Sequence, residues 1–188
     1  MTTTIAKTQV TVEDLYHVPE DGKAEIINGA LVLMSPTGDA PGYAGGEVFA
    51  SLREYARRTG AGRAVPDNVG FAVNLPHRKS FSPDAAFYTG PRAGMRFFTG
   101  APAFAVEIRS ENDYGPVAEQ NIADKRADYF AAGAQVVWDV DLLHEDVVKV
   151  YRASDPHNPT VYRRGQVAEA EPAVPGWTMP VDELLAGL

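Results

Sequence analysis

The chain has 188 residues, and its 17 Lys and Arg against 25 Asp and Glu give a formal net charge of −8. Hydrophobic residues make up 45% and charged residues 22% of the sequence, a balance that predicts a folded soluble protein and excludes a disordered one. The length is that of one ordinary domain with its own core. The acidity argues against a protein that coats nucleic acid nonspecifically, because phosphate binding requires dense Lys and Arg.

Cysteine is absent, which excludes disulfides, Cys-ligated metal sites and a cysteine nucleophile. The N-terminal sequence MTTTIAKTQV lacks the apolar core of a signal peptide, and no stretch is continuously apolar for about 18 residues. We therefore expect a cytoplasmic protein without a membrane segment. No repeat or Ser/Gly linker interrupts the sequence, so we expect a flexible leader over residues 1–10 and a single domain over residues 11–188.

The first half of the domain predicts a short helix, a hairpin and a long helix. Thr11 with an acid three residues later resembles a capping box, and the short helix that it starts is ended by Pro19 to Gly22. Asn28-Gly29 between two apolar runs predicts a β-hairpin. After a loop over Ser35–Gly42, apolar residues at helical spacing predict a helix that contains Val48–Ala56 and ends before a glycine.

Strands dominate the second half. They are expected, in chain order, at Phe71–Leu75, Ala85–Tyr88, Phe104–Ile108, Val136–Val140, Val147–Tyr151 and Thr160–Arg163. A second long helix is expected over Asn121–Ala132, and a short one near Asp182–Ala186. The apolar strand after the second long helix should lie near the middle of the sheet. Strands with two substantial helices between them predict an α/β or α+β fold, with a mixed sheet and helices on its faces.

Asp84 is the first candidate functional residue. It follows a proline in Ser82-Pro83-Asp84-Ala85, at the start of a predicted strand. The proline restricts Ser82 to extended backbone, so Asp84 enters the strand in a fixed direction. An Asp in a β-turn has the same local sequence, and both interpretations stay open.

Glu107 lies in the middle of an apolar strand, on the face that it shares with Ala105 and Arg109. A carboxylate in this position must be paired, hydrogen-bonded or bound to metal, because an isolated buried charge is too costly. The alternatives are a solvent-facing Glu on a one-sided sheet and a salt bridge to Arg109.

Lys125 shares one stripe of the second long helix with Ile122 and Tyr129, while Asp124 and Asp128 would take the outward positions. Lys125 should therefore lie on or beside the face that packs against the sheet. Its ammonium then either points at an anionic site on the sheet or snorkels to solvent with its stem over apolar surface.

Asp84, Glu107 and Lys125 can meet where two neighbouring strands and the following helix come together. Two carboxylates suit a hard divalent ion such as Mg²⁺ or Mn²⁺, which needs few protein ligands. Such an ion would polarise a phosphodiester and acidify water, while Lys125 orients or deprotonates that water or neutralises developing charge. Glu25, at the start of the hairpin, would alone be an ordinary strand carboxylate.

At these residues the sequence resembles the PD-(D/E)xK nuclease superfamily, and more closely the Uma family of restriction-endonuclease-type proteins. The resemblance rests on AEIINGALVLMSP, SPDAAF, FAVEIRSEND, and KRADYFAAGAQVVWDVD followed by VVKVYR, in this order over residues 11 to 185. It implies a restriction-endonuclease-like fold with a mixed central sheet flanked by helices, to which the N-terminal hairpin and the C-terminal strands are additions. It also implies metal-dependent hydrolysis of phosphodiester bonds, in DNA.

By this resemblance Asp84 and Glu107 are the motif acids, and Glu25 matches an acid of the early hairpin and is a third candidate metal ligand. The superfamily usually carries its lysine two positions after the glutamate, where this chain has Arg109. In the Uma pattern the next helix offers the lysine, which matches Lys125.

Two features depart from the family pattern. A histidine often found at the start of the first long helix is replaced by Gly45 or a neighbour. The interval after the motif glutamate, through Ser110–Gln120, is long and predicts a lid or a substrate contact.

Basic residues are candidate contacts to the DNA backbone, although a solvated helix face explains the first three equally well: Arg53, Arg57, Arg58, Arg78, Lys79 and Arg109. No zinc site is expected, because no metal-binding spacing links the histidines His17, His77, His144 and His157. Serine-hydrolase, NTPase and dinucleotide motifs are absent. Trp138 and Trp177 are expected in the core or an interface.

The sequence thus predicts a Mg²⁺- or Mn²⁺-dependent endonuclease that acts on DNA through Asp84, Glu107 and Lys125. One alternative is a domain that keeps the fold without cleaving and binds nucleic acid or protein, with a homodimer left open. Another is a metal-dependent hydrolase of a small phosphate ester. The retained acid–lysine set favours the nuclease.

Overall fold

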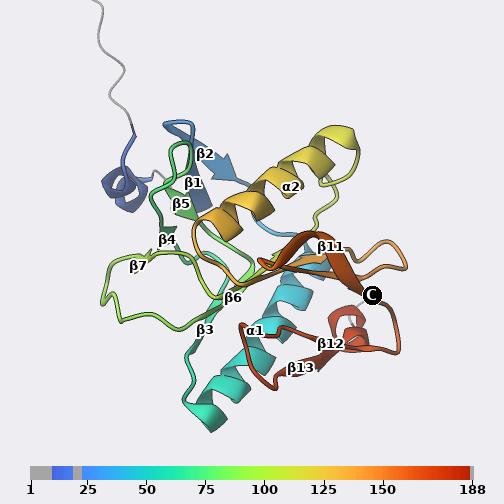
Figure 1. Cartoon of the computed structure of the whole chain (residues 1–188). Helices are drawn as coiled ribbons and strands as arrows, with labels where there is room; N and C mark the ends of the chain where they lie inside the picture. Colours follow the sequence, from blue (N-terminus) through green and yellow to red (C-terminus); the bar gives the residue numbers. More distant parts are fainter. Residues whose placement is uncertain (1–9, 19–22, 187–188) are drawn as a thin grey trace, which may run out of the picture.

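The computed structural model describes residues 10–18 and 23–186 (Figure 1). Its centre is a six-stranded mixed sheet in which β8 and β9 are parallel and the other neighbouring pairs are antiparallel. From one edge to the other, the strands are β11 (Asp155–Tyr162), β10 (Val148–Arg152), β9 (Val136–Val140), β8 (Phe104–Ile108), β6 (Ala85–Tyr88) and β3 (Arg63–Pro66). The mixed sheet flanked by helices confirms the predicted fold class, and β9 lies centrally as expected.

Two helices cover opposite faces of this sheet, α1 (Asp39–Thr59) and α2 (Pro116–Ala131) (Figure 1). Helix α1 accommodates Pro41 in its first turn, where a helix needs no backbone N–H from that residue. It ends at Gly60, whose φ of 68° is the left-handed conformation that glycine adopts without strain. Helix α2 begins with a proline at its first position.

Strand β8 shows how the two faces are divided. Phe104, Val106 and Ile108 pack into the large apolar core shared with α1. Ala105 belongs to the smaller core on the other face, and Glu107 contacts α2 on that face. The alternation read from the sequence is therefore confirmed, and it places Glu107 on the side of α2.

The N-terminal part forms a hairpin of β1 (Lys23–Ile27) and β2 (Ala30–Met34). Its turn places Asn28 at φ 51° and Gly29 at φ 74°, the positive angles that the Asn-Gly pair predicts. The predicted capping box is also present, at the start of the 3-10 helix η1 (Val12–His17). A small sheet joins β5 (Ser80–Phe81), β4 (Phe71–Ala72) and β7 (Phe98–Thr99) in this order.

The C-terminal segment packs against the face of the sheet that α1 covers. It contains β12 (Val167–Glu169), β13 (Thr178–Pro180) and the 3-10 helix η3 (Val181–Leu185). The rings of Trp138 and Trp177 lie 5.2 Å apart between their centroids, and the Trp177 indole N–H donates to Ser51 of α1 at 3.0 Å. Both tryptophans are buried, which confirms their expected place in the core.

Several element boundaries differ from the predictions. Helix α1 begins at Asp39, inside the expected loop, because its one proline, Pro41, falls in the first turn, where it is tolerated. The strand expected over Phe71–Leu75 ends at Ala72, because the chain then turns back and Leu75 N–H donates to Arg78. Residues 1–9 and 19–22, which include most of the expected leader and the predicted helix breaker, lie outside the described residues. No helix within residues 10–18 and 23–186 is both long and apolar enough to cross a membrane.

Candidate active site

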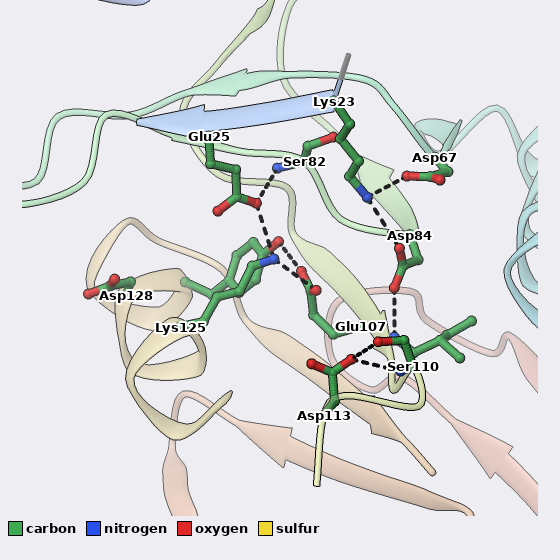
Figure 2. Close-up of polar contacts among 12 residues, drawn as sticks. Lys23, Glu25, Asp67, Ser82, Asp84, Glu107, Ser110, Asp113, Lys125 and Asp128 are labelled. Carbon is green, nitrogen blue, oxygen red and sulfur yellow. Dashed lines mark hydrogen bonds and ion pairs between the residues drawn. The ribbon is translucent and has the colours of Figure 1, made fainter. Parts of the chain in front are cut away.

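Asp84 lies just before β6, at the point where this strand pairs with β8. Its backbone N–H donates to the Val106 carbonyl at 3.0 Å, which fixes the direction of the side chain. One carboxylate oxygen, Oδ2, accepts the N–H of Ile108 at 2.7 Å, and the other, Oδ1, accepts from the Lys23 ammonium at 3.3 Å (Figure 2). Asp84 is therefore held beside the end of β8 by backbone and by charge, and is not an isolated turn residue.

Glu107 and Lys125 form a partly buried ion pair across the gap between β8 and α2. The Lys125 Nζ lies 2.9 Å from Glu107 Oε2, and the Tyr129 hydroxyl donates to Glu107 Oε1 at 2.6 Å. Figure 2 shows the Glu107 and Lys125 side chains pointing at one another from strand and helix. The pair excludes both a solvent-facing Glu107 and a Lys125 that snorkels away from the sheet.

The electrostatics of this pair are set by burial and by the neighbouring acids. Burial raises the pKa of Glu107 to about 7; attraction to Lys125 offsets part of the rise, while the nearby Asp84 adds to it. Burial alone would lower the pKa of Lys125, but attraction to Glu107 and Glu25 exceeds that effect and raises the pKa overall. Lys125 is therefore a fixed cation, and Glu107 exchanges its proton near neutrality.

Glu25 is completely buried and lies behind Lys125. Its Oε1 accepts from the Ser82 N–H at 3.0 Å and lies 3.1 Å from Lys125 Nζ, and its Oε2 accepts from Arg78 at 2.5 Å. Burial opposes ionisation of Glu25, but Lys125 and Arg78 outweigh it and lower the pKa of Glu25. Glu25 is thus a charged anchor for Lys125, although it does not line the pocket that contains Asp84 and Glu107.

Arg78 and Asp128 continue this row of charges away from the pocket. Arg78 Nε donates to Asp128 Oδ2 at 2.7 Å, and the ring of His77 lies 2.6 Å from Asp128 Oδ1. Asp128 was expected on the outward face of its helix, and this expectation is wrong because Arg78 draws the carboxylate into a buried pair.

Arg109 is also enclosed by carboxylates. It donates two hydrogen bonds to Asp139 at 2.7 and 2.8 Å and pairs with Glu119 of α2. A salt bridge between Glu107 and Arg109 was one expectation, and the geometry replaces it with these two partners. Arg78 and Arg109 are both buried, so neither lies on the open surface. Arg109 lines the pocket beside Glu107, and its contact with nucleic acid stays a prediction.

The other basic candidates lie on the surface, and their contact with DNA stays a prediction. Arg53, Arg57 and Arg58 are exposed on the C-terminal half of α1, whereas the N-terminal half approaches the site. There, a Cβ placed on Gly45 would lie 3.5 Å from the Asp84 carbonyl oxygen. Lys79 donates to Asn74 at 2.8 Å.

Lys23 is the site residue that sequence reasoning missed. Its Nζ lies 2.6 Å from Asp67 Oδ1 and 3.3 Å from Asp84 Oδ1 (Figure 2). Burial would lower the pKa of Lys23, but the two carboxylates raise it overall. Strand alternation puts Lys23 on the same face of its strand as Glu25. This pattern alone does not predict a contact with Asp84, because it does not say where the hairpin docks.

A pocket of about 930 Å³ opens over these side chains. Its walls come from the hairpin and the following loop, from the end of β8, from the loop after it and from the first turns of α2. The charged residues that line it include Lys23, Asp84, Glu107, Arg109, Lys125 and Asp139. The loop expected over Ser110–Gln120 is shorter than predicted, because α2 already begins at Pro116. Within this loop, the Ser110 N–H donates a hydrogen bond to the Asp113 carboxylate at 2.7 Å.

The donor set of this pocket fits a hard divalent cation. Asp84, just before β6, and Glu107, on the adjacent β8, supply carboxylate oxygens, and one or two carboxylates with water are a usual set for Mg²⁺. Among the residues that the structure describes, no group of three His, Cys, Asp or Glu is placed to share an ion. The fit therefore rests on two protein ligands, with room in the pocket for water and substrate oxygens.

Comparisons with known proteins agree with the fold and with the family that the sequence resembles. A family profile, Uma2, described as "Putative restriction endonuclease", matches residues 11–182. Among solved structures, the chain is similar to a putative nuclease belonging to DUF820 from Anabaena variabilis, with a TM-score of 0.73 at 18% identity over 94% of this chain and 98% of that chain. This likeness shows a shared fold, and no curated protein matches the chain. The chain belongs to the Uma2 family of putative restriction endonucleases.

Proposed function

We propose that the protein is a metal-dependent endonuclease that hydrolyses phosphodiester bonds in DNA at Asp84, Glu107 and Lys125. The observation that carries the proposal is the 2.9 Å pairing of Lys125 with Glu107, in a pocket that Asp84 lines as well. Burial of a carboxylate on an apolar strand is unfavourable, and Lys125 and the Tyr129 hydroxyl offset part of that cost. Family membership supports a nuclease function.

Asp84 and Glu107 are the residues that would hold Mg²⁺ or Mn²⁺. When bound, such an ion polarises a phosphodiester and makes water a better nucleophile at neutral pH. The hydrogen bonds from the Ile108 N–H and from Tyr129 restrict the orientations of the two carboxylates, as partners of a metal ligand commonly do.

Lys125 acts as a cation in this site and not as a base. Its raised pKa keeps the ammonium charged, because Glu107 and Glu25 both attract the proton. A charged ammonium at the pocket wall donates hydrogen bonds to a phosphate oxygen or to water and offsets the negative charge that develops during hydrolysis. Glu25 positions Lys125 from behind, with Arg78 as its second partner.

The direct test is cleavage of plasmid and single-stranded DNA in Mg²⁺ or Mn²⁺ by the wild type, by Asp84→Asn, Glu107→Gln and Lys125→Met, and by a control. Asp124→Asn is the matched control, because Asp124 is exposed on α2 and bonds to Gln120 at 2.8 Å. We expect the three site variants to lose about 10²-fold or more in rate and the control to keep the wild-type rate.

Cleavage that survives loss of either carboxylate would contradict the site. Calorimetric titration of Mn²⁺ into the same proteins separates the remaining functions. A wild type that binds the ion but leaves DNA intact would favour a hydrolase of small phosphate esters, whereas neither binding nor cleavage would favour a domain that keeps the fold and only binds nucleic acid or protein.

A further inference from the structure

Lys23 is a second, largely buried lysine of the pocket, and the proposed reaction gives it no role. Its side chain is 13% exposed, and the residue lines the same pocket as Asp84, Glu107 and Lys125. A buried ammonium requires negative partners, and Lys23 has two, Asp67 and Asp84. One of these partners is a proposed metal ligand.

The two contacts of Lys23 are unequal. The distance to Asp67 Oδ1 is 2.6 Å, which is a short charge-assisted hydrogen bond, whereas the distance to Asp84 Oδ1 is 3.3 Å. Asp67 is itself held in place, because its Oδ1 also accepts the Asn68 N–H at 2.6 Å. Asp67 is therefore the anchor of Lys23, and Asp84 is the partner that Lys23 can release at lower cost.

Lys125 differs from Lys23 in this respect. It lies between two carboxylates at 2.9 and 3.1 Å, and one of them, Glu25, is fully buried. Neither contact of Lys125 is long, so its position is fixed from both sides. Of the two lysines in the pocket, Lys125 is thus fixed and Lys23 has a releasable contact.

We propose that Lys23 is the internal counter-ion of Asp84 in the metal-free protein. When a divalent cation binds Asp84, Lys23 stays on Asp67 and contacts the substrate phosphate. This role rests on the proposed nuclease function. Asp67 positions Lys23 and does not bind metal. The chemistry that the site recognises is a phosphodiester anion, held between Lys23 on the hairpin side and Lys125 on the helix side.

The proposal predicts opposite effects on metal affinity and on cleavage, which a purely structural lysine would not produce. Lys23→Met removes the cation that competes for Asp84, so Mn²⁺ should bind the substrate-free protein about threefold to tenfold more tightly by calorimetry. The same variant should cleave DNA about tenfold to 10²-fold more slowly. Its DNA affinity, measured with Ca²⁺ in place of Mg²⁺, should depend less steeply on salt, with a slope reduced by about one.

Asp67→Asn is the matched positioning variant. Without its anchor, Lys23 depends on Asp84 alone, so Mn²⁺ should bind more weakly than to the wild type. In the Lys23→Met background, Asp67→Asn should have no further effect on Mn²⁺ binding, because Asp67 acts through Lys23. Lys149→Met controls for loss of one positive charge, since Lys149 lies on β10 and does not line the pocket.

Unchanged or weaker Mn²⁺ binding by Lys23→Met would overturn the counter-ion role, and a loss of Mn²⁺ affinity on adding Asp67→Asn to Lys23→Met would show that Asp67 is a ligand. Cleavage by Lys23→Met at the rate of Lys149→Met would overturn the phosphate contact. If the wild type cleaves no DNA, the nuclease proposal fails with the phosphate contact, while the Mn²⁺ titrations still decide whether Lys23 is the counter-ion of Asp84.

Discussion

Glu107→Gln is expected to stabilise the metal-free protein above about pH 7. Burial raises the pKa of Glu107 from 4.5 to about 7, so the folded protein keeps a proton here that the unfolded chain loses in this interval. The free energy of unfolding of the wild type therefore falls as the pH rises from 4.5 to 7, and the loss is complete above the folded pKa. A glutamine can still accept the hydrogen bond from Tyr129 but cannot ionise, so this loss disappears.

The size of the effect follows from the two pKa values. Their difference corresponds to about 3 kcal/mol at about 1.36 kcal/mol per unit. The Glu107 side chain is 25% exposed at the pocket, so water screens part of the cost and we expect about 2 kcal/mol at about pH 8. For a chain of this length, that difference raises the melting temperature by roughly 4–8 °C.

The assay is denaturant unfolding in EDTA at several pH values from about 5 to 8, with wild type, Glu107→Gln and the control Asp124→Asn. The curves of unfolding free energy against pH for the wild type and Glu107→Gln should converge at the acidic end and separate as the pH rises. Parallel curves, or a Glu107→Gln variant that is less stable than the wild type at the alkaline end, would show that burial does not raise the pKa of Glu107.

Three further predictions concern the surroundings of the pocket. Arg78→Met leaves the carboxylates of Glu25 and Asp128 without their shared cation, so it should lower the free energy of unfolding, measured with urea, by about 3–5 kcal/mol. A loss below about 1 kcal/mol would show that the ion pairs of Arg78 are not buried in solution. Mn²⁺ affinity in calorimetry should fall about tenfold for each pH unit below about 7, because the metal requires Glu107 without its proton, and a flat profile down to about pH 5 would contradict that ligand. Gly45→Ala should stabilise α1 by about 0.5–1 kcal/mol, since the added Cβ meets neighbours no closer than ordinary contact at 3.5 Å, whereas a drop in melting temperature would show that this approach is tighter.

The positions of Asp84, Glu107 and Lys125 could be predicted because each depends on a local sequence pattern. Strand alternation puts Glu107 on one face of β8, and helical spacing puts Lys125 on the face of α2 that meets it. The Pro-Asp pair fixes where Asp84 enters β6. Elements that are adjacent in sequence are usually adjacent in space, so these faces had few ways to meet.

The residues that were missed or misplaced depend on how distant elements dock. Lys23 meets Asp67 and Asp84 only because the hairpin docks beside β5, and no spacing in the sequence encodes that contact. Arginine is usually a surface residue. Arg78 and Arg109 are buried because carboxylates from other elements of the fold pair with them. A charged residue is assigned to the surface by default, and the exceptions are those that the tertiary structure pairs.

The hairpin of β1 and β2 gives the protein a way to lose its site without losing its fold. It is a two-stranded unit outside the six-stranded sheet, joined to the rest through contacts such as Ile26 N–H to Ser80 Oγ at 2.9 Å. Two strands alone are marginally stable, so this unit is a candidate for local opening at a free energy below that of global unfolding. Because it carries both Lys23 and Glu25, one such opening removes a cation and the anchor of Lys125 together. Mild heat or denaturant would then inactivate the protein before its sheet melts, and amide exchange in the hairpin would report the inactivation.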